Sequence, residues 1–191
     1  MNRLIVPALI AAVVVFIWMF ISWTVIGWHN TDMKSIKDQA IIELMKTSLT
    51  EPGIYLYPGH PEGGDADMEE WTNKYKTGPL VNFMVYHPEG SDPMSPMIFI
   101  KSFIINFIAA FIAGVLLMMT LAQNPNFWRR VIFVTLLGLF AGFLGPFMDW
   151  NWWSIPTGYT IVEVADYCLT WFFAGLVLAW RIKPELNTQA A

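Results

Sequence analysis

Cysteine and histidine are scarce in this sequence, and several familiar motifs are missing from it. The 191 residues include one cysteine, Cys168, and this count excludes disulfides, CxxC redox chemistry and thiolate zinc sites. None of the three histidines lies deep in an apolar stretch, which excludes b-type haem held by paired histidines. The GxxxxGK(S/T), GxSxG and HExxH patterns are also lacking. We therefore predict that the protein is not an enzyme and binds no cofactor.

Charge is nearly absent from four long stretches of the chain. Only 14% of the residues are charged, and almost all of these lie outside the stretches. A bilayer core is crossed by about 20 apolar residues, and a backbone surrounded by lipid must be helical. We predict an all-α membrane protein, a bundle of four transmembrane helices with a small α+β cap between spans 1 and 2. The apolar stretches are Leu4–Trp28, Met97–Ala122, Val131–Met148 and Tyr159–Trp180.

Positive charge in the short connections predicts the orientation. Arg129 and Arg130 join spans 2 and 3, Arg3 precedes span 1, and Arg181 and Lys183 follow span 4. The positive-inside rule places these residues, and both termini, in the cytoplasm. The first span is too long for a signal peptide, so we expect an uncleaved anchor. The predicted division is span 1 at 1–28, a cap at 29–96, spans at 97–122, 131–148 and 159–181, and a cytoplasmic tail at 182–191.

The segment 29–96 is acidic, with five lysines against eleven acidic residues. It is too long for a plain connection, so it should fold. Its turn and capping residues predict two helices and two antiparallel strands, but two strands alone are marginally stable. The cap must therefore pack on its own helices, on the membrane helices or on a partner. The predicted elements are a helix at Met33–Leu49 capped by Asp32, a strand at Ile54–Tyr57, a helix at Asp67–Lys76 and a strand at Leu80–Tyr86.

His-Pro-Glu-Gly occurs twice in the cap, each time just after a predicted strand. The residues that could bind zinc or copper there are His60, Glu62, His87 and Glu89. Alternatively, proline and glycine simply build turns, and the histidines are incidental. Antiparallel strands would separate the two motifs, whereas parallel strands would bring them together. We predict no metal site and keep these four residues as the only candidates.

Ionisable residues inside the spans suggest an intramembrane polar cluster of Lys101, Glu163, Asp166 and Asp149. Glu163 and Asp166 are three positions apart and share a helix face. We expect Lys101 to pair with one of them across spans 2 and 4, because an unpaired charge at that depth is costly. Two alternatives are an outward-facing pocket for a proton or ion, and a lysine that extends outward to the headgroups.

Small residues mark close helix packing in two spans. Gly138, Gly142 and Gly145 lie along the third span, and Ala110 and Gly114 lie on the second. Such residues allow two helix backbones to approach each other. The pattern predicts either a compact bundle or a lateral contact with another subunit.

Several short motifs carry a resemblance to a known family. They are Glu51–Gly59, Tyr75–Pro79 and Tyr86–Gly90 in the cap, and Trp150–Thr157 after the third span. Together they resemble a family of bacterial four-span inner-membrane proteins with a periplasmic cap, over nearly the whole chain. The resemblance implies a bacterial inner membrane and a periplasmic cap, and it implies no activity.

The favoured hypothesis is a non-enzymatic membrane subunit or scaffold that presents its acidic periplasmic cap to partners in a membrane assembly. The expected partners are membrane lipid and either further copies of this chain or other membrane-protein subunits, with no nucleic acid, since no basic patch is present. One alternative is a small-solute or proton carrier or channel that uses Lys101, Glu163 and Asp166. Another is a periplasmic metal or ligand sensor that uses His60 and His87.

Overall fold

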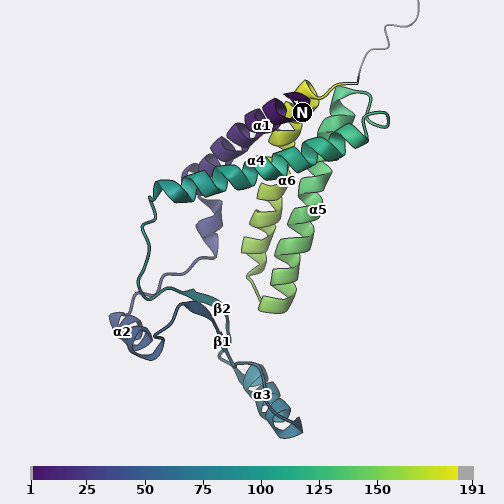
Figure 1. The fold of residues 1–191 in the computed structure, drawn as a ribbon. Helices are drawn as coiled ribbons and strands as arrows, with labels where there is room; N and C mark the ends of the chain where they lie inside the picture. The colour runs from purple at the N-terminus through teal and green to yellow at the C-terminus, as the bar shows by residue number, and fades with distance from the viewer. Residues whose placement is uncertain (1, 185–191) are drawn as a thin grey trace, which may run out of the picture. The chain divides into compact units, whose positions relative to one another are not determined.

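The computed structural model describes residues 2–184, which are mostly helical (Figure 1). The chain divides into two compact units, residues 34–93 and the remaining residues before and after them. We call the first unit the cap and the second the helical body. The body contains α1 (Asn2–Phe20), a π-helix η1 (Ile21–Ile26), a 3₁₀ turn η2 (Trp28–Thr31), α4 (Pro96–Met119), α5 (Phe127–Trp153) and α6 (Thr157–Arg181).

Four helices of the body are long and apolar enough to span a membrane. The prediction of four spans is confirmed in this respect, although the helix ends differ from those expected. The third span was predicted over 131–148, whereas α5 covers Phe127–Trp153. It begins earlier because the Asn126 side chain caps it by accepting a hydrogen bond from the Arg129 backbone N–H at 2.9 Å. It also continues through Pro146 for seven more residues.

Small side chains let the four long helices pack closely. α1 packs against α4 and α6, and α6 packs against α5, while α4 and α5 meet only slightly. Gly138 and Gly142 of α5 lie directly against Trp171 and Tyr167 of α6. Gly138 and Gly142 therefore pack helices within one chain, whereas nothing in the described part of the chain lies against Gly145. The buried apolar core consists of Ala8, Ala11, Val15, Ala110, Ala113, Leu117, Val134, Ala174, Leu178 and Ile182.

The chain turns back on itself at the end of the first span. The wider turn of η1 ends at Gly27, whose φ of 66° lies in the left-handed region that favours glycine. The Gly27 N–H donates to the Ser22 carbonyl at 3.1 Å, and η2 then carries His29 back beside Ser22. We call residues 22–29 the hook.

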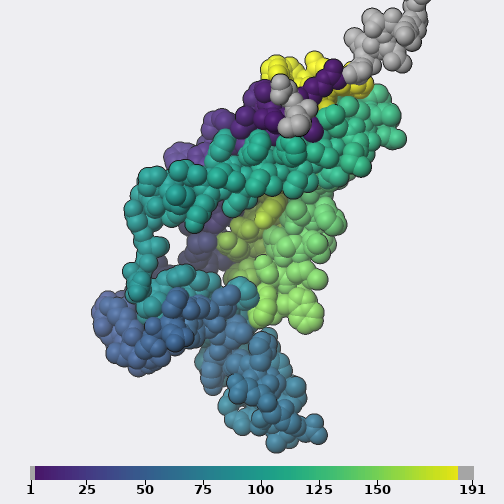
Figure 2. All heavy atoms as spheres, viewed as in Figure 1, coloured from purple at the N-terminus to yellow at the C-terminus, as the bar shows by residue number. Residues whose placement is uncertain are grey.

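One end of the body is rich in basic residues. The start of α1 and the ends of α4 and α6 meet at one end, where Figure 2 shows the purple and yellow segments side by side. A cavity of about 590 Å³ there is lined by Arg3, Arg181 and Lys183. Nearby, the buried guanidinium of Arg130 donates to the Pro125 carbonyl at 2.7 Å and to the Ala179 carbonyl at 3.3 Å. The basic residues of the short connections thus gather at one end of the body.

The cap contains α2 (Gln39–Ser48), β1 (Gly53–Tyr57), α3 (Asp65–Thr77) and β2 (Val81–Tyr86). The strands are antiparallel as predicted, with Gly53 opposite Tyr86 and Tyr57 opposite Val81. The predicted helix start near Asp32 is wrong. Asp38 caps α2 instead, and its carboxylate accepts a hydrogen bond from the Ala40 N–H at 2.9 Å. No residue between 34 and 93 is buried.

Candidate functional site: a buried imidazole between two carboxylates

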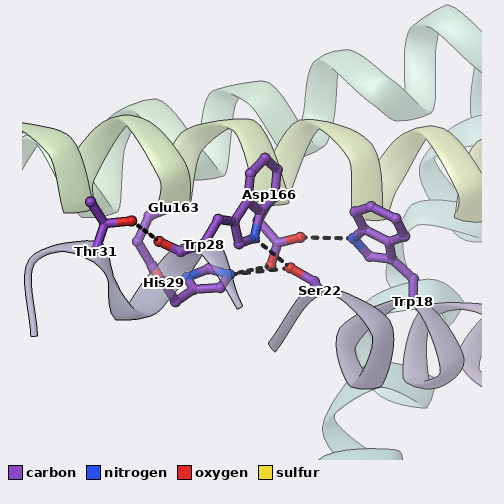
Figure 3. Close-up of polar contacts among 7 residues, drawn as sticks. All are labelled: Trp18, Ser22, Trp28, His29, Thr31, Glu163 and Asp166. Atoms are coloured by element: carbon purple, nitrogen blue, oxygen red, sulfur yellow. Dashed lines mark hydrogen bonds and ion pairs between the residues drawn. The ribbon is translucent and has the colours of Figure 1, made fainter. Parts of the chain in front are cut away.

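A histidine that sequence analysis did not place in any site lies at the centre of the body's polar contacts. The hook brings His29 against α6 (Figure 3). Only 1% of its side chain is exposed. The Trp23 ring stacks on the imidazole with 4.0 Å between ring centroids and 2° between ring planes. Trp28 meets the imidazole edge-on at 5.9 Å. Aromatic rings therefore shield this imidazole from water.

Two carboxylates of α6 flank the imidazole. Nδ1 of His29 lies 3.3 Å from Oε1 of Glu163, and Nε2 lies 3.3 Å from Oδ2 of Asp166. Glu163 and Asp166 are three residues apart, so one face of α6 presents both carboxylates to the same ring. We call His29, Glu163 and Asp166 the imidazole–carboxylate cluster.

Hydrogen bonds from the first span hold the Asp166 side of the cluster. The Trp18 indole N–H donates to Asp166 Oδ1 at 2.8 Å, and the Trp28 indole N–H donates to Ser22 Oγ at 2.8 Å (Figure 3). Ser22 Oγ in turn lies 3.2 Å from Nε2 of His29. Both Asp166 oxygens therefore have a partner, and the ring is fixed on its Nε2 side.

The Nδ1 side of the ring is less tightly held. Nδ1 is buried and has no hydrogen bond of good geometry, although Glu163 Oε1 lies 3.3 Å away. A bare nitrogen lone pair facing an ionised carboxylate is repulsive, whereas an imidazolium N–H between two carboxylates is attractive. With both carboxylates ionised and the imidazole protonated, the cluster would carry one net negative charge, and one further proton would make it neutral. The arrangement can thus gain or release a proton.

The cluster is arranged differently from a metal centre. Its two carboxylates contact opposite nitrogens of one ring, so they do not converge on a common point. Within residues 2–184, no group of three or more histidine, cysteine, aspartate or glutamate side chains is placed to hold a metal ion. The geometry therefore fits proton exchange better than a shared metal ion.

Two cavities reach the cluster. One of about 340 Å³ lies among α1, α4 and α6, and it includes Glu163, Asp166 and Tyr167 in its lining. The other, of about 230 Å³, lies between α5 and α6 and is lined in part by Asp149, Glu163 and Tyr167. Glu163 can therefore be approached from either side of α6.

Lys101 does not join the cluster. Its side chain is exposed, and it has no ion pair within the part of the chain that the structure describes; the carboxylates meet His29 instead. Lys101 and the buried Ala110 are nine residues apart, which at about 100° per residue places them on opposite faces of α4. Asp149 is also exposed and reaches the site only through the cavity that it shares with Glu163.

The two His-Pro-Glu-Gly turns of the cap do not meet. His60 follows β1 at the Tyr57 end of the antiparallel pair, and His87 follows β2 at the opposite end. His60 and Glu62 line a small hollow against α3, together with Trp71. Glu89 belongs to the other turn, so the four candidate residues cannot share one ion.

Sequence analysis used His29 only to exclude haem. One signal nearby could have identified it. Gly27 at the end of an apolar stretch indicates a turn, and a turn there can bring His29 back beside Ser22. Comparison of the chain with models of known protein families, with curated proteins and with solved structures gave no match. The function must therefore be argued from the geometry of the site.

Proposed function

We propose that this chain is a membrane carrier that moves protons and a small solute through the imidazole–carboxylate cluster. The observation that carries the proposal is the 1% exposure of His29 between two carboxylates of α6. Ionisable residues within a membrane-spanning body are costly and commonly mark ion or proton routes. Histidine is the side chain whose charge ordinarily changes near neutral pH.

Access from two cavities supports transport in preference to a purely structural ion pair. Glu163 and Tyr167 line the cavities on both sides of α6. A proton on Glu163 can therefore be exchanged with one cavity or with the other. Other ionisable side chains that face the cluster are Tyr167 on α6, Tyr159 on α6, 6.3 Å from the imidazole by ring centroids, and Asp149 on α5. On α4, Asn106 contributes an uncharged amide to the first cavity.

The proposal places the protein in a bacterial inner membrane, as the family resemblance implies. The end of the body that gathers Arg3, Arg130, Arg181 and Lys183 would face the cytoplasm, since short basic segments are retained there. The hook and the cap would then face the periplasm, and the cluster would receive protons from that side.

Proton flux into liposomes tests this function. The purified protein is reconstituted with a pH-sensitive dye inside, and a potassium diffusion potential drives protons inward. We expect flux above that of empty liposomes, and a loss of about tenfold or more in Glu163→Gln, because this change removes a proton acceptor. Lys101→Met serves as the control and should stay within about twofold, since Lys101 lies outside the cluster. Equal flux in protein-containing and empty liposomes would overturn the proposal.

A second candidate function rests on a different observation. No residue between 34 and 93 is buried, although exposed apolar side chains such as Ile41, Leu44 and Val85 are present in this unit. Such a unit gains stability by packing on another surface. We infer that the cap supports the role of an assembly subunit as well. Native mass analysis of gently solubilised membranes should show a complex, and a strictly monomeric protein without co-purifying partners would contradict this role.

A further inference from the structure

The cavity among α1, α4 and α6 has the lining of a small-molecule site. Its volume of about 340 Å³ lies within the range of ligand pockets, at the lower end. Aliphatic and aromatic side chains from three helices form most of its wall, among them Val15, Met19, Ile105 and Trp171. Ligand sites typically combine such a wall with a few convergent polar groups. A mainly apolar ligand would therefore fit it.

The charge inside this cavity is unbalanced. Glu163 and Asp166 both line it, and none of the described residues in its lining is a lysine or an arginine. The basic group beside them is the His29 imidazole, which even when it carries a proton balances only one of the two carboxylates. The cavity thus lacks one positive charge, and a proton or a bound cation can supply it.

The aromatic wall favours an organic cation over a metal ion. Trp171 and Trp23 line the cavity, and the faces of aromatic rings attract alkylammonium groups; one face of Trp23 is already stacked on His29. A bare metal ion would gain little from these rings and would need several oxygen ligands, whereas the two carboxylates lie on opposite sides of the imidazole.

We propose that this cavity binds a lipophilic ammonium cation, which replaces the proton that neutralises the imidazole–carboxylate cluster. The inference rests on the proposed function and names the class of solute that would be exchanged for protons. Cation and proton compete for the same negative charge, so binding should weaken as the pH falls. The ionisable groups that face this charge are His29, Tyr159, Tyr167 and Asp149.

The test uses two probes of the same shape. Benzyltrimethylammonium is the cation, and neopentylbenzene is its neutral counterpart, with carbon in place of nitrogen. The full chain is placed in nanodiscs of zwitterionic lipid, and the cation is titrated calorimetrically with and without the neutral probe. We expect the cation to bind and the neutral probe to compete at least about tenfold less well, since only the cation gains the charged contact. Equal competition by the neutral probe would overturn the inference.

Three variants identify the site. Glu163→Gln should weaken cation binding about tenfold, whereas the same change at the exposed Glu69 of the cap should stay within about twofold. Ala109→Phe, which fills the cavity and leaves both carboxylates in place, should also abolish binding. It keeps the test decisive if Glu163→Gln fails to fold. Unchanged binding in Ala109→Phe would place the cation elsewhere and overturn the inference.

A separate measurement distinguishes this inference from the proposed function. Nitrogen NMR of labelled histidine reports whether His29 takes up a proton, and this reading does not require a bound cation. It is combined with the proton flux into liposomes. If protons cross the liposome membrane but the ammonium probe does not bind, the solute class is wrong and proton movement stands. If neither occurs, both proposals fail.

Discussion

The helical body and the cap are held together in different ways. The body has a core of buried alanine, valine, leucine and isoleucine side chains and a polar cluster around a buried imidazole. The cap has no buried residue at all, and its order comes from a helix cap, local ion pairs and one pair of strands. Substitutions in the body should therefore act through tertiary packing and buried charge, whereas substitutions in the cap should act locally.

The largest loss of stability is expected from His29→Leu. It removes the imidazole that lies between Glu163 and Asp166 and leaves both carboxylates without this partner. Breaking a buried pair in this way costs about 3–5 kcal/mol. Thermal unfolding in detergent should show the loss, and it should shrink when Glu163→Gln is added. Lys101→Met is the comparison, and an equal loss in that variant would mean that the cluster does not stabilise the body.

A smaller loss is expected from Gly138→Ala in α5. The added Cβ would overlap the Trp171 side chain of α6, and overpacking costs about 1–3 kcal/mol. Gly145→Ala on the same helix is the matched control, because a Cβ there meets open space. That change should alter stability by less than about 1 kcal/mol. Equal unfolding temperatures for the two variants would argue against the close packing of α5 on α6.

In the cap, Asp38→Ala should cost about 1 kcal/mol, since it removes the hydrogen bond to the Ala40 N–H at the start of α2. The loss should be local: amide exchange should speed up in α2 and stay unchanged in the body. Asp38→Ser can still accept this hydrogen bond and should keep most of the protection. Faster exchange throughout the body would show that the loss is not local.

The smallest effects should come from two exposed ion pairs of the cap. Hydrogen bonds from Lys46 and Lys74 lower the pKa of Glu43 and Glu70, respectively. A carboxyl whose pKa is lowered by folding stabilises the fold above its ordinary pKa and loses that contribution as the pH falls through the folded value. Acidification from about pH 6 to pH 3 should therefore weaken α2 and α3 slightly, as amide exchange can measure. Glu70→Gln should remove the pH dependence of α3 alone.

The apolar stretches allowed the four long helices to be predicted, because few other structures can place so many apolar residues in lipid. The antiparallel strands followed from turn residues on either side of two short β-prone runs. The spacing of Glu163 and Asp166 likewise indicated a shared helix face. These features depend on residues that are close together in the sequence.

The rest depends on which helices meet, and local patterns do not contain that information. Lys101 matched the carboxylates in depth, but it faces away from the packed side of α4. The partner of the carboxylates lies in the hook, where a π-helix and a left-handed glycine reverse the chain. The start of α2 was misplaced because Asp32 and Asp38 are both suitable caps, and only the structure distinguishes them.

The distance along the chain between the two sides of the cluster has a consequence for synthesis. Trp18 and Asp166 are hydrogen-bonded partners that lie 148 positions apart. During translation α1 and the hook are therefore made long before α6 exists, and the Trp18 indole and the His29 imidazole have no carboxylate partner until then. The helix with the carboxylates, α6, is made later, and an aspartate at a helix centre costs about 3 kcal/mol to place in a membrane. Contacts between these carboxylates and the hook offset that cost. A chain whose synthesis stops before α6 therefore leaves the Trp18 indole and the His29 imidazole without their partners.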